Sequence, residues 1–173
     1  MANENTAVAV KRETVDVVLS KVQGFKNTGE LIFPPNYSPE NALKSAWLII
    51  QETTDLNKKP ALEVCTKESI ANALLSMTIQ ALNPDKKQCY FIVYGNKLQM
   101  QRSYFGSIAV AKSVSNGKVV DIIPEVIYEG DVFEYTKKRG KNVVTKHEQS
   151  FDNINKDNIK GAYATIIYSV LIS

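Results

Sequence analysis

The chain has 173 residues, of which 44% are apolar and 23% are charged. This size and composition suit a single globular core, and they argue against a disordered chain and against a two-domain enzyme. The 21 basic and 18 acidic residues leave a net charge of only +3, so any site for a polyanion must be local. Two cysteines and one histidine predict neither a disulfide framework nor a zinc site. We expect a cytoplasmic protein that is neither secreted nor inserted in a membrane.

The N-terminal part is the least regular in pattern. We expect residues 1–12 to form a mobile arm and residues 13–21 to form a short helix. Residues 23–37 contain glycines and prolines between isolated apolar residues, which predicts an extended connection that packs on the domain or on a neighbouring subunit. We therefore divide the chain into an arm with its connection, residues 1–37, which is a candidate subunit contact, and a core, residues 38–173.

Two amphipathic helices are expected at the start of the core. The segment 38–40 reads Ser-Pro-Glu, which is typical of a helix start, and the helix continues to about Thr53. A second helix follows Thr66 and ends before the Asn-Pro pair at 83–84. Trp47 lies on the apolar stripe of the first helix, so we interpret it as a core residue.

After residue 88 the apolar period changes from that of a helix to that of a strand. The pair Gly95-Asn96 predicts a two-residue turn, and Ser103 can cap a helix. The expected elements are strands at 89–94 and 97–101, a helix at 104–113, and strands at 119–128, 132–135, 143–147 and 162–172. The sequence therefore predicts an α+β fold, with N-terminal helices followed by a mostly antiparallel sheet and a packed helix.

A search for catalytic patterns finds no P-loop, no dinucleotide-binding glycine pattern, no nucleophile elbow and no spaced metal-ligand cluster. We expect no catalytic residue, no cofactor and no metal ion. His147 lies beside Lys146 and Glu148 at a polar strand end. We interpret it as a surface residue, because nothing nearby in the sequence would orient it as a base. Cys65 and Cys89 are interpreted as core residues.

Positive charge is concentrated between Gly95 and Val120, where the sequence holds four basic residues and no acidic one. Alternation along the expected strand places three long polar side chains on one face: Lys97, Gln99 and Gln101. The opposite face carries Leu98 and Met100. This segment is a local basic zone in a chain of small net charge.

The residue types in this zone suit a polynucleotide. Arg102 and Tyr104 follow the polar strand, and Lys112 lies in the next helix. Basic side chains neutralise phosphates, amides bind phosphate or sugar oxygens, and aromatic rings contact exposed bases. The zone therefore predicts a nucleic-acid surface, and the alternative is an ordinary solvated hairpin face.

A second basic cluster is expected at a hairpin tip. It consists of Lys137, Lys138, Arg139 and Lys141. Such a tip can serve solubility alone, or it can close over a phosphate backbone. Acidic residues precede the tip, and we expect them to lie largely off the binding surface: Asp121, Glu125, Glu129, Asp131 and Glu134.

A series of short motifs resembles one protein family. In chain order they are Pro60-Ala61-Leu62, Leu82-Asn83-Pro84, Gly95-Asn96-Lys97, Tyr104-Phe105-Gly106, Glu129-Gly130-Asp131 with Phe133, and Gly161-Ala162-Tyr163-Ala164. Their order and spacing resemble the RecT family of phage and prophage single-strand annealing recombinases, from about residue 38 to residue 172. Since members of this family usually continue further, we expect the core to be cut short at its C-terminal end.

The resemblance implies a protein that binds single-stranded DNA and pairs it with its complement without ATP. It also implies a ring or helical filament of subunits that holds the annealed duplex, and an architecture shared with Redβ and Rad52. The expected partners are a phage exonuclease and a single-strand-binding protein of the bacterial host. No covalent bond is made or broken in this activity.

The resemblance and the charge pattern together suggest a binding groove. It would be lined by Lys97, Gln99, Gln101, Arg102 and Lys112, while the second basic cluster clamps the outer strand. Leu98 or Met100 could wedge between bases, and the alternative is that both pack in the core. Two rival functions remain: a phage protein-interaction domain whose basic hairpin binds an acidic partner, and a nuclease.

Overall fold

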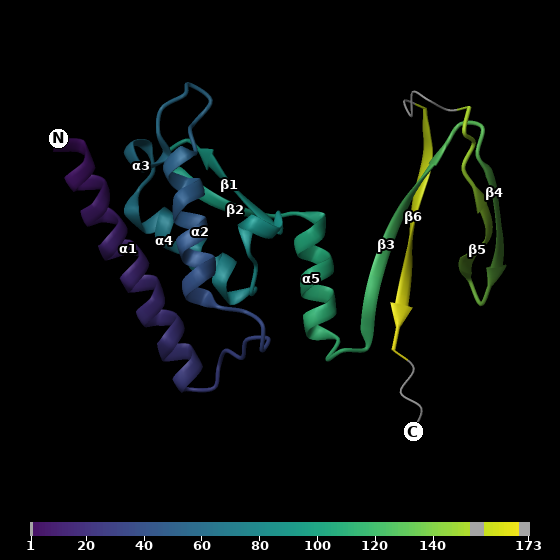
Figure 1. Ribbon diagram of the computed structural model, residues 1–173, viewed down its shortest axis with the longest axis horizontal. Helices are drawn as coiled ribbons and strands as arrows, with labels where there is room; N and C mark the ends of the chain where they lie inside the picture. The colour runs from purple at the N-terminus through teal and green to yellow at the C-terminus, as the bar shows by residue number, and fades with distance from the viewer. Residues whose placement is uncertain (1, 153–157, 170–173) are drawn as a thin grey trace. The chain divides into compact units, whose positions relative to one another are not determined.

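The computed structural model describes residues 2–152 and 158–169, and the chain divides into two compact units, Met1–Asn116 and Gly117–Ser173. Helices come first and antiparallel strands follow, so the predicted α+β class is confirmed (Figure 1). Among the helices described, none is both long enough and apolar enough to cross a membrane. The division into residues 1–37 and 38–173 stays a prediction.

The first unit begins with one long helix, α1 (Ala2–Asn27). The short helix expected over 13–21 is therefore wrong in its bounds, because residues 2–12 belong to the same helix, while the mobility expected for residues 1–12 stays a prediction. Val18 and Val22 lie one turn apart and are buried, and α1 contacts α2 and α4 (Figure 1). Once packing stabilises these turns, a segment without Gly or Pro extends the helix upstream at little cost.

The rest of the first unit consists of short helices and one hairpin. Its elements are α2 (Pro39–Glu52), α3 (Ala61–Val64), α4 (Lys67–Ile79), the 3₁₀ helix η1 (Pro84–Lys86), β1 (Cys89–Tyr94), β2 (Lys97–Arg102) and α5 (Tyr104–Val114). Ser38 caps α2 by accepting a hydrogen bond from Asn41 N at 3.2 Å, as the sequence predicts. Trp47 is fully buried at the centre of the core, together with Leu43, Ile50, Leu74 and Met77.

The β1–β2 hairpin forms as predicted, with antiparallel pairs from Cys89–Arg102 to Tyr94–Lys97. Gly95 takes a φ of +59° at the turn, a conformation that glycine adopts without strain. The buried face of the hairpin packs on the helices of the first unit. The opposite face of β2 is therefore turned to solvent.

Ser103 caps helix α5, since its Oγ accepts a hydrogen bond from Gly106 N at 3.1 Å. The start of the helix lies so close to the segment between η1 and β1 that a Cβ on Gly106 would be 2.1 Å from the Gln88 carbonyl oxygen. Only glycine fits here, which explains the third position of the Tyr-Phe-Gly motif.

The second unit contains two antiparallel ribbons. One pairs β3 (Val119–Tyr128) with β6 (Ile159–Tyr168), and the other pairs β4 (Val132–Lys138) with β5 (Lys141–Glu148). Together with β1–β2, the described strands form three separate two-stranded sheets and not one continuous sheet. The end of the strand expected at 162–172 lies outside the described residues.

Candidate nucleic-acid interface

The exposed face of β2 carries the polar side chains that the sequence singled out. Lys97, Gln99 and Gln101 are exposed, and the antiparallel register places them opposite Tyr94, Ile92 and Tyr90. Tyr90 and Tyr94 are about half exposed, and Tyr94 Oη accepts a hydrogen bond of 2.8 Å from Gln101 Nε2. One face therefore presents a cation, two long amides and two aromatic rings.

The two candidate wedge residues point the other way. Leu98 is 3% exposed and belongs to the hydrophobic core, and Met100 packs against that core while half-buried. Both residues therefore occupy positions that fit core packing and not a wedge between bases.

The polar face continues past the end of β2. Arg102 is exposed and its Nη1 donates a hydrogen bond of 3.1 Å to Gln80 Oε1. Tyr104 and Phe105 at the start of α5 are both exposed, and their ring centroids lie 3.9 Å apart. The structure thus brings Arg102 and an aromatic pair close together at the junction of β2 and α5.

Lys112 is half-buried and lines a cavity of about 430 Å³. The cavity lies between the N-terminus of α2, the end of α4, η1 and α5. It is lined mainly by amides and cations, which include Asn36, Asn41, Gln80, Gln88, Lys86 and Lys112, and no carboxylate lines it. Gln80 lines this cavity and also accepts the hydrogen bond from Arg102, so the cavity adjoins the polar face that starts on β2.

The second basic cluster lies at the end of the β4–β5 ribbon, and all four of its side chains are exposed. The strands are longer than predicted, so the turn contains only Arg139 and Gly140, both with positive φ. Lys138 faces Lys141 across the strands, whereas Lys137 faces Asn142 on the opposite side of the ribbon. Lys97, Arg102 and Lys112 belong to the first unit, whereas this cluster belongs to the second.

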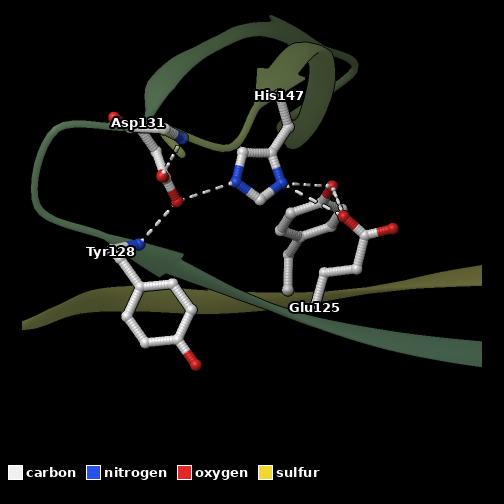
Figure 2. A network of polar contacts seen from close by, with 6 residues as sticks. Glu125, Tyr128, Asp131 and His147 are labelled. Carbon is white, nitrogen blue, oxygen red and sulfur yellow. Dashed lines mark hydrogen bonds and ion pairs between the residues drawn. The ribbon is translucent and has the colours of Figure 1, made fainter. Parts of the chain in front are cut away.

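The interpretation of His147 as a surface residue is wrong. Its side chain is only 5% exposed and lies between two carboxylates (Figure 2). His147 Nδ1 lies 3.1 Å from Glu125 Oε2 and 3.0 Å from Tyr163 Oη, and Nε2 lies 3.2 Å from Asp131 Oδ2. We call these four residues the His147 cluster.

The carboxylates of the cluster are themselves held in place. Asp131 accepts hydrogen bonds from Tyr128 N at 2.8 Å and from Ser150 N at 2.9 Å, and its side chain is 1% exposed. Tyr163 Oη donates to Glu125 Oε2 at 2.5 Å. The cluster therefore joins β3, the β3–β4 turn, β5 and β6 within the second unit.

These contacts shift the pKa values of all four groups. The hydrogen bond to Asp131, and then that to Glu125, raises the pKa of His147 above 6.5 in spite of burial. Hydrogen bonds from Tyr163 and then His147 lower the pKa of Glu125, while the backbone N–H groups of Tyr128 and Ser150 lower that of Asp131. Glu125 in turn raises the pKa of Tyr163 to about 12.

Comparison with known proteins decides the family. A model of the RecT family matches residues 40–169, which is most of the chain. The chain belongs to the RecT family. This confirms the resemblance predicted from the motifs, and it makes single-strand annealing in DNA recombination the functional class of the protein. No curated protein and no solved structure gave a significant match.

The structure shows what several of the RecT-like motifs do. Gly95-Asn96-Lys97 makes the β1–β2 turn, and Gly106 allows α5 to start against the backbone of Gln88. Asp131 of the Glu-Gly-Asp motif and Tyr163 of the Gly-Ala-Tyr-Ala motif both contact His147. Sequence reasoning recognised these two motifs but missed the cluster, because Asp131 and Tyr163 each lie 16 residues from His147 along the chain.

The part of the chain that the structure describes contains no group of three or more His, Cys, Asp or Glu residues that could hold a metal ion. The free thiols of Cys65 and Cys89 are buried, and burial raises the pKa of Cys89 to about 12. Neither thiol is placed to act as a nucleophile, since only the thiolate is reactive.

Proposed function

We propose that this RecT family protein binds single-stranded DNA on the exposed face of the β1–β2 hairpin and pairs it with a complementary strand without ATP. The observation that carries the proposal is the exposed face of β2. There, Lys97, Gln99 and Gln101 lie beside two half-exposed tyrosines, and neither strand of the hairpin contains an acidic residue. Arg102 and the cavity beside Lys112 extend this face.

The residue types suit sequence-independent binding. Lysine and arginine neutralise phosphates, and tyrosine rings stack on bases of any sequence. Contacts to the backbone leave base edges free to test pairing with a second strand. Positive charge also offsets the repulsion between the two approaching strands. The β4–β5 tip, with its four exposed basic residues, would hold the outer strand.

Assembly of several subunits into a ring or filament is part of the proposal. The segment 1–37 is the proposed subunit contact, because α1 and the connection after it expose apolar side chains, such as Val17 at 49% and Ile32 at 87%. A phage exonuclease and a host single-strand-binding protein, in the bacterial cytoplasm, are the proposed partners.

The test is a strand-pairing assay. The protein is mixed with a labelled oligonucleotide and then with its labelled complement, and pairing is followed by fluorescence transfer without ATP over a salt series. We expect pairing to accelerate in a salt-sensitive way, and the complex formed by sequential addition to be more stable than one formed with preformed duplex. An absence of DNA binding at low salt would overturn the proposal in favour of a protein-interaction domain.

A further inference from the structure

The arrangement of donors and acceptors around His147 is unusual, because an acidic side chain lies at each ring nitrogen. Glu125 Oε2 lies 3.1 Å from Nδ1, and Asp131 Oδ2 lies 3.2 Å from Nε2 (Figure 2). A neutral imidazole has one N–H donor and one acceptor nitrogen. In either neutral tautomer, a nitrogen lone pair therefore faces a carboxylate oxygen.

Tyr163 does not relieve this conflict. Its hydroxyl has a single proton, and the contact of 2.5 Å places that proton between Tyr163 Oη and Glu125 Oε2. The hydroxyl oxygen then faces Nδ1 at 3.0 Å as an acceptor. Only the imidazolium, which donates from both nitrogens, satisfies Glu125, Asp131 and Tyr163 together.

We call the contacts of the His147 imidazolium with Glu125, Asp131 and Tyr163 the His147 clamp, or the clamp for short. This clamp joins the two ribbons of the second unit. His147 lies on β5, Glu125 on β3 and Tyr163 on β6, while Asp131 follows β3 in the turn to β4. The ring of Phe133 on β4 packs beside this cluster, and its centroid lies 5.7 Å from the ring centroids of His147 and Tyr163. In the described part of this unit no apolar residue is buried, so these polar contacts contribute a large share of the packing between its two ribbons.

We propose that His147 is a positioning residue for DNA binding: as an imidazolium it fixes the β4–β5 ribbon, and with it Lys137, Lys138, Arg139 and Lys141, on the β3–β6 ribbon. Loss of the proton loosens this attachment and lowers the affinity for single-stranded DNA. The DNA-linked part of this inference rests on the proposed function, whereas the clamp itself does not.

The direction of the pH dependence follows from the charged groups that face His147. The pKa of His147 in the folded protein is raised, so its contribution to the stability of the fold is complete below pH 6.5. This contribution is lost as the pH rises through the folded pKa. The folded pKa values of Glu125 and Asp131 are lowered from 4.5 and 3.8, so the stability that these carboxylates contribute is present above those values. It is lost as the pH falls through the folded pKa values. The neighbours Lys146 and Glu148 pair with each other at 3.3 Å. The clamp is therefore strongest in mildly acidic solution.

The first experiment measures the clamp without DNA. The chain has one histidine, so the imidazole carbon-bound protons give a single set of NMR signals in the 173-residue chain labelled at histidine. We expect a pKa above 6.5 that falls in Glu125→Gln. The control is Glu148→Gln, which removes an acidic residue next to His147 that does not contact its ring, and we expect no change. A pKa at or below 6.5, or equal shifts in both variants, overturns the clamp.

The second experiment measures affinity for a labelled single-stranded oligonucleotide from about pH 6 to about pH 8.5, the range in which histidine titrates. We expect the affinity of the wild type to fall severalfold with a midpoint at the NMR pKa, that of His147→Gln to stay nearly level, and the midpoint of Glu125→Gln to move to lower pH. Equal pH profiles for the wild type and Glu125→Gln overturn the positioning role, even if His147→Gln fails to fold. Absence of DNA binding at every pH overturns the proposed function as well, while the NMR result still decides the clamp.

Discussion

The two units of this protein are stabilised in different ways. The first unit packs three helices and the inner face of a hairpin around Trp47, Leu74 and other fully buried residues. The second unit has no buried apolar residue in its described part, and its ribbons meet at His147, two carboxylates and a tyrosine. The first unit is therefore held together by apolar packing, whereas in our proposal the position of the second basic cluster depends on the proton of His147.

The largest expected effect comes from the core of the first unit. Trp47→Ala should lower the free energy of unfolding by about 3–5 kcal/mol, because it empties a fully enclosed site. The matched change in the second unit, Ile123→Ala, removes a side chain that is 39% exposed, and it should cost less than about 1 kcal/mol. Urea denaturation measures both. Equal losses would contradict the contrast between the units.

The close approach of α5 to Gln88 gives the next largest effect. Gly106→Ala places a Cβ 2.1 Å from the Gln88 carbonyl oxygen, so the backbone must move, and we expect a loss of about 1–3 kcal/mol. Gly24→Ala in α1 is the control, since nothing lies within 4 Å of its added Cβ, and it should stabilise the protein by about 0.5–1 kcal/mol. Thermal melting compares the two. A neutral Gly106→Ala would contradict the close approach of α5 to the backbone of Gln88.

The proposed DNA face on the first unit gives a smaller effect, visible only with DNA. Arg102→Ala should weaken binding to all sequences alike and reduce the slope of log affinity against log salt by about one unit, because about one phosphate contact is lost. Lys44→Ala, an exposed lysine on α2, should leave the slope unchanged. Titrations at several salt concentrations measure the slope, and an unchanged slope for Arg102→Ala would remove this residue from the binding face.

The smallest expected effect concerns the hydrogen bond between Tyr163 and Glu125 in the second unit. Tyr163→Phe removes the hydrogen bond that does most to lower the pKa of Glu125, so this pKa should rise toward 4.5. Because a lowered carboxyl pKa stabilises the fold only above it, the acid limit of the clamp should move to higher pH. Amide hydrogen exchange in β4 and β5 should show the shift, while the hairpin β1–β2 serves as internal control. Equal changes in both hairpins would contradict a local role.

The elements that the sequence predicted well are those with local signals. Ser38 and Ser103 cap their helices, and Gly95 turns the first hairpin, because capping and turn geometry need only neighbouring residues. The expected strand at 119–128 matches β3 for the same reason, since it is bounded by turn residues on both sides. Alternation along β2 also separated Leu98 from Lys97 and Gln99, although only the structure shows that Leu98 enters the core.

What needed the tertiary structure was every feature that depends on distant partners. Residues 2–12 extend a helix because Val18 and Val22 pack on α2 and α4, which no local pattern reveals. His147 looked like a surface residue because its partners lie 16 to 22 residues away along the chain. The sequence by itself determined the α+β class, the local turns and caps and the family, since these depend on short-range patterns. Only the tertiary structure decided which side chains meet, because antiparallel pairing and packing bring together residues that are far apart along the chain.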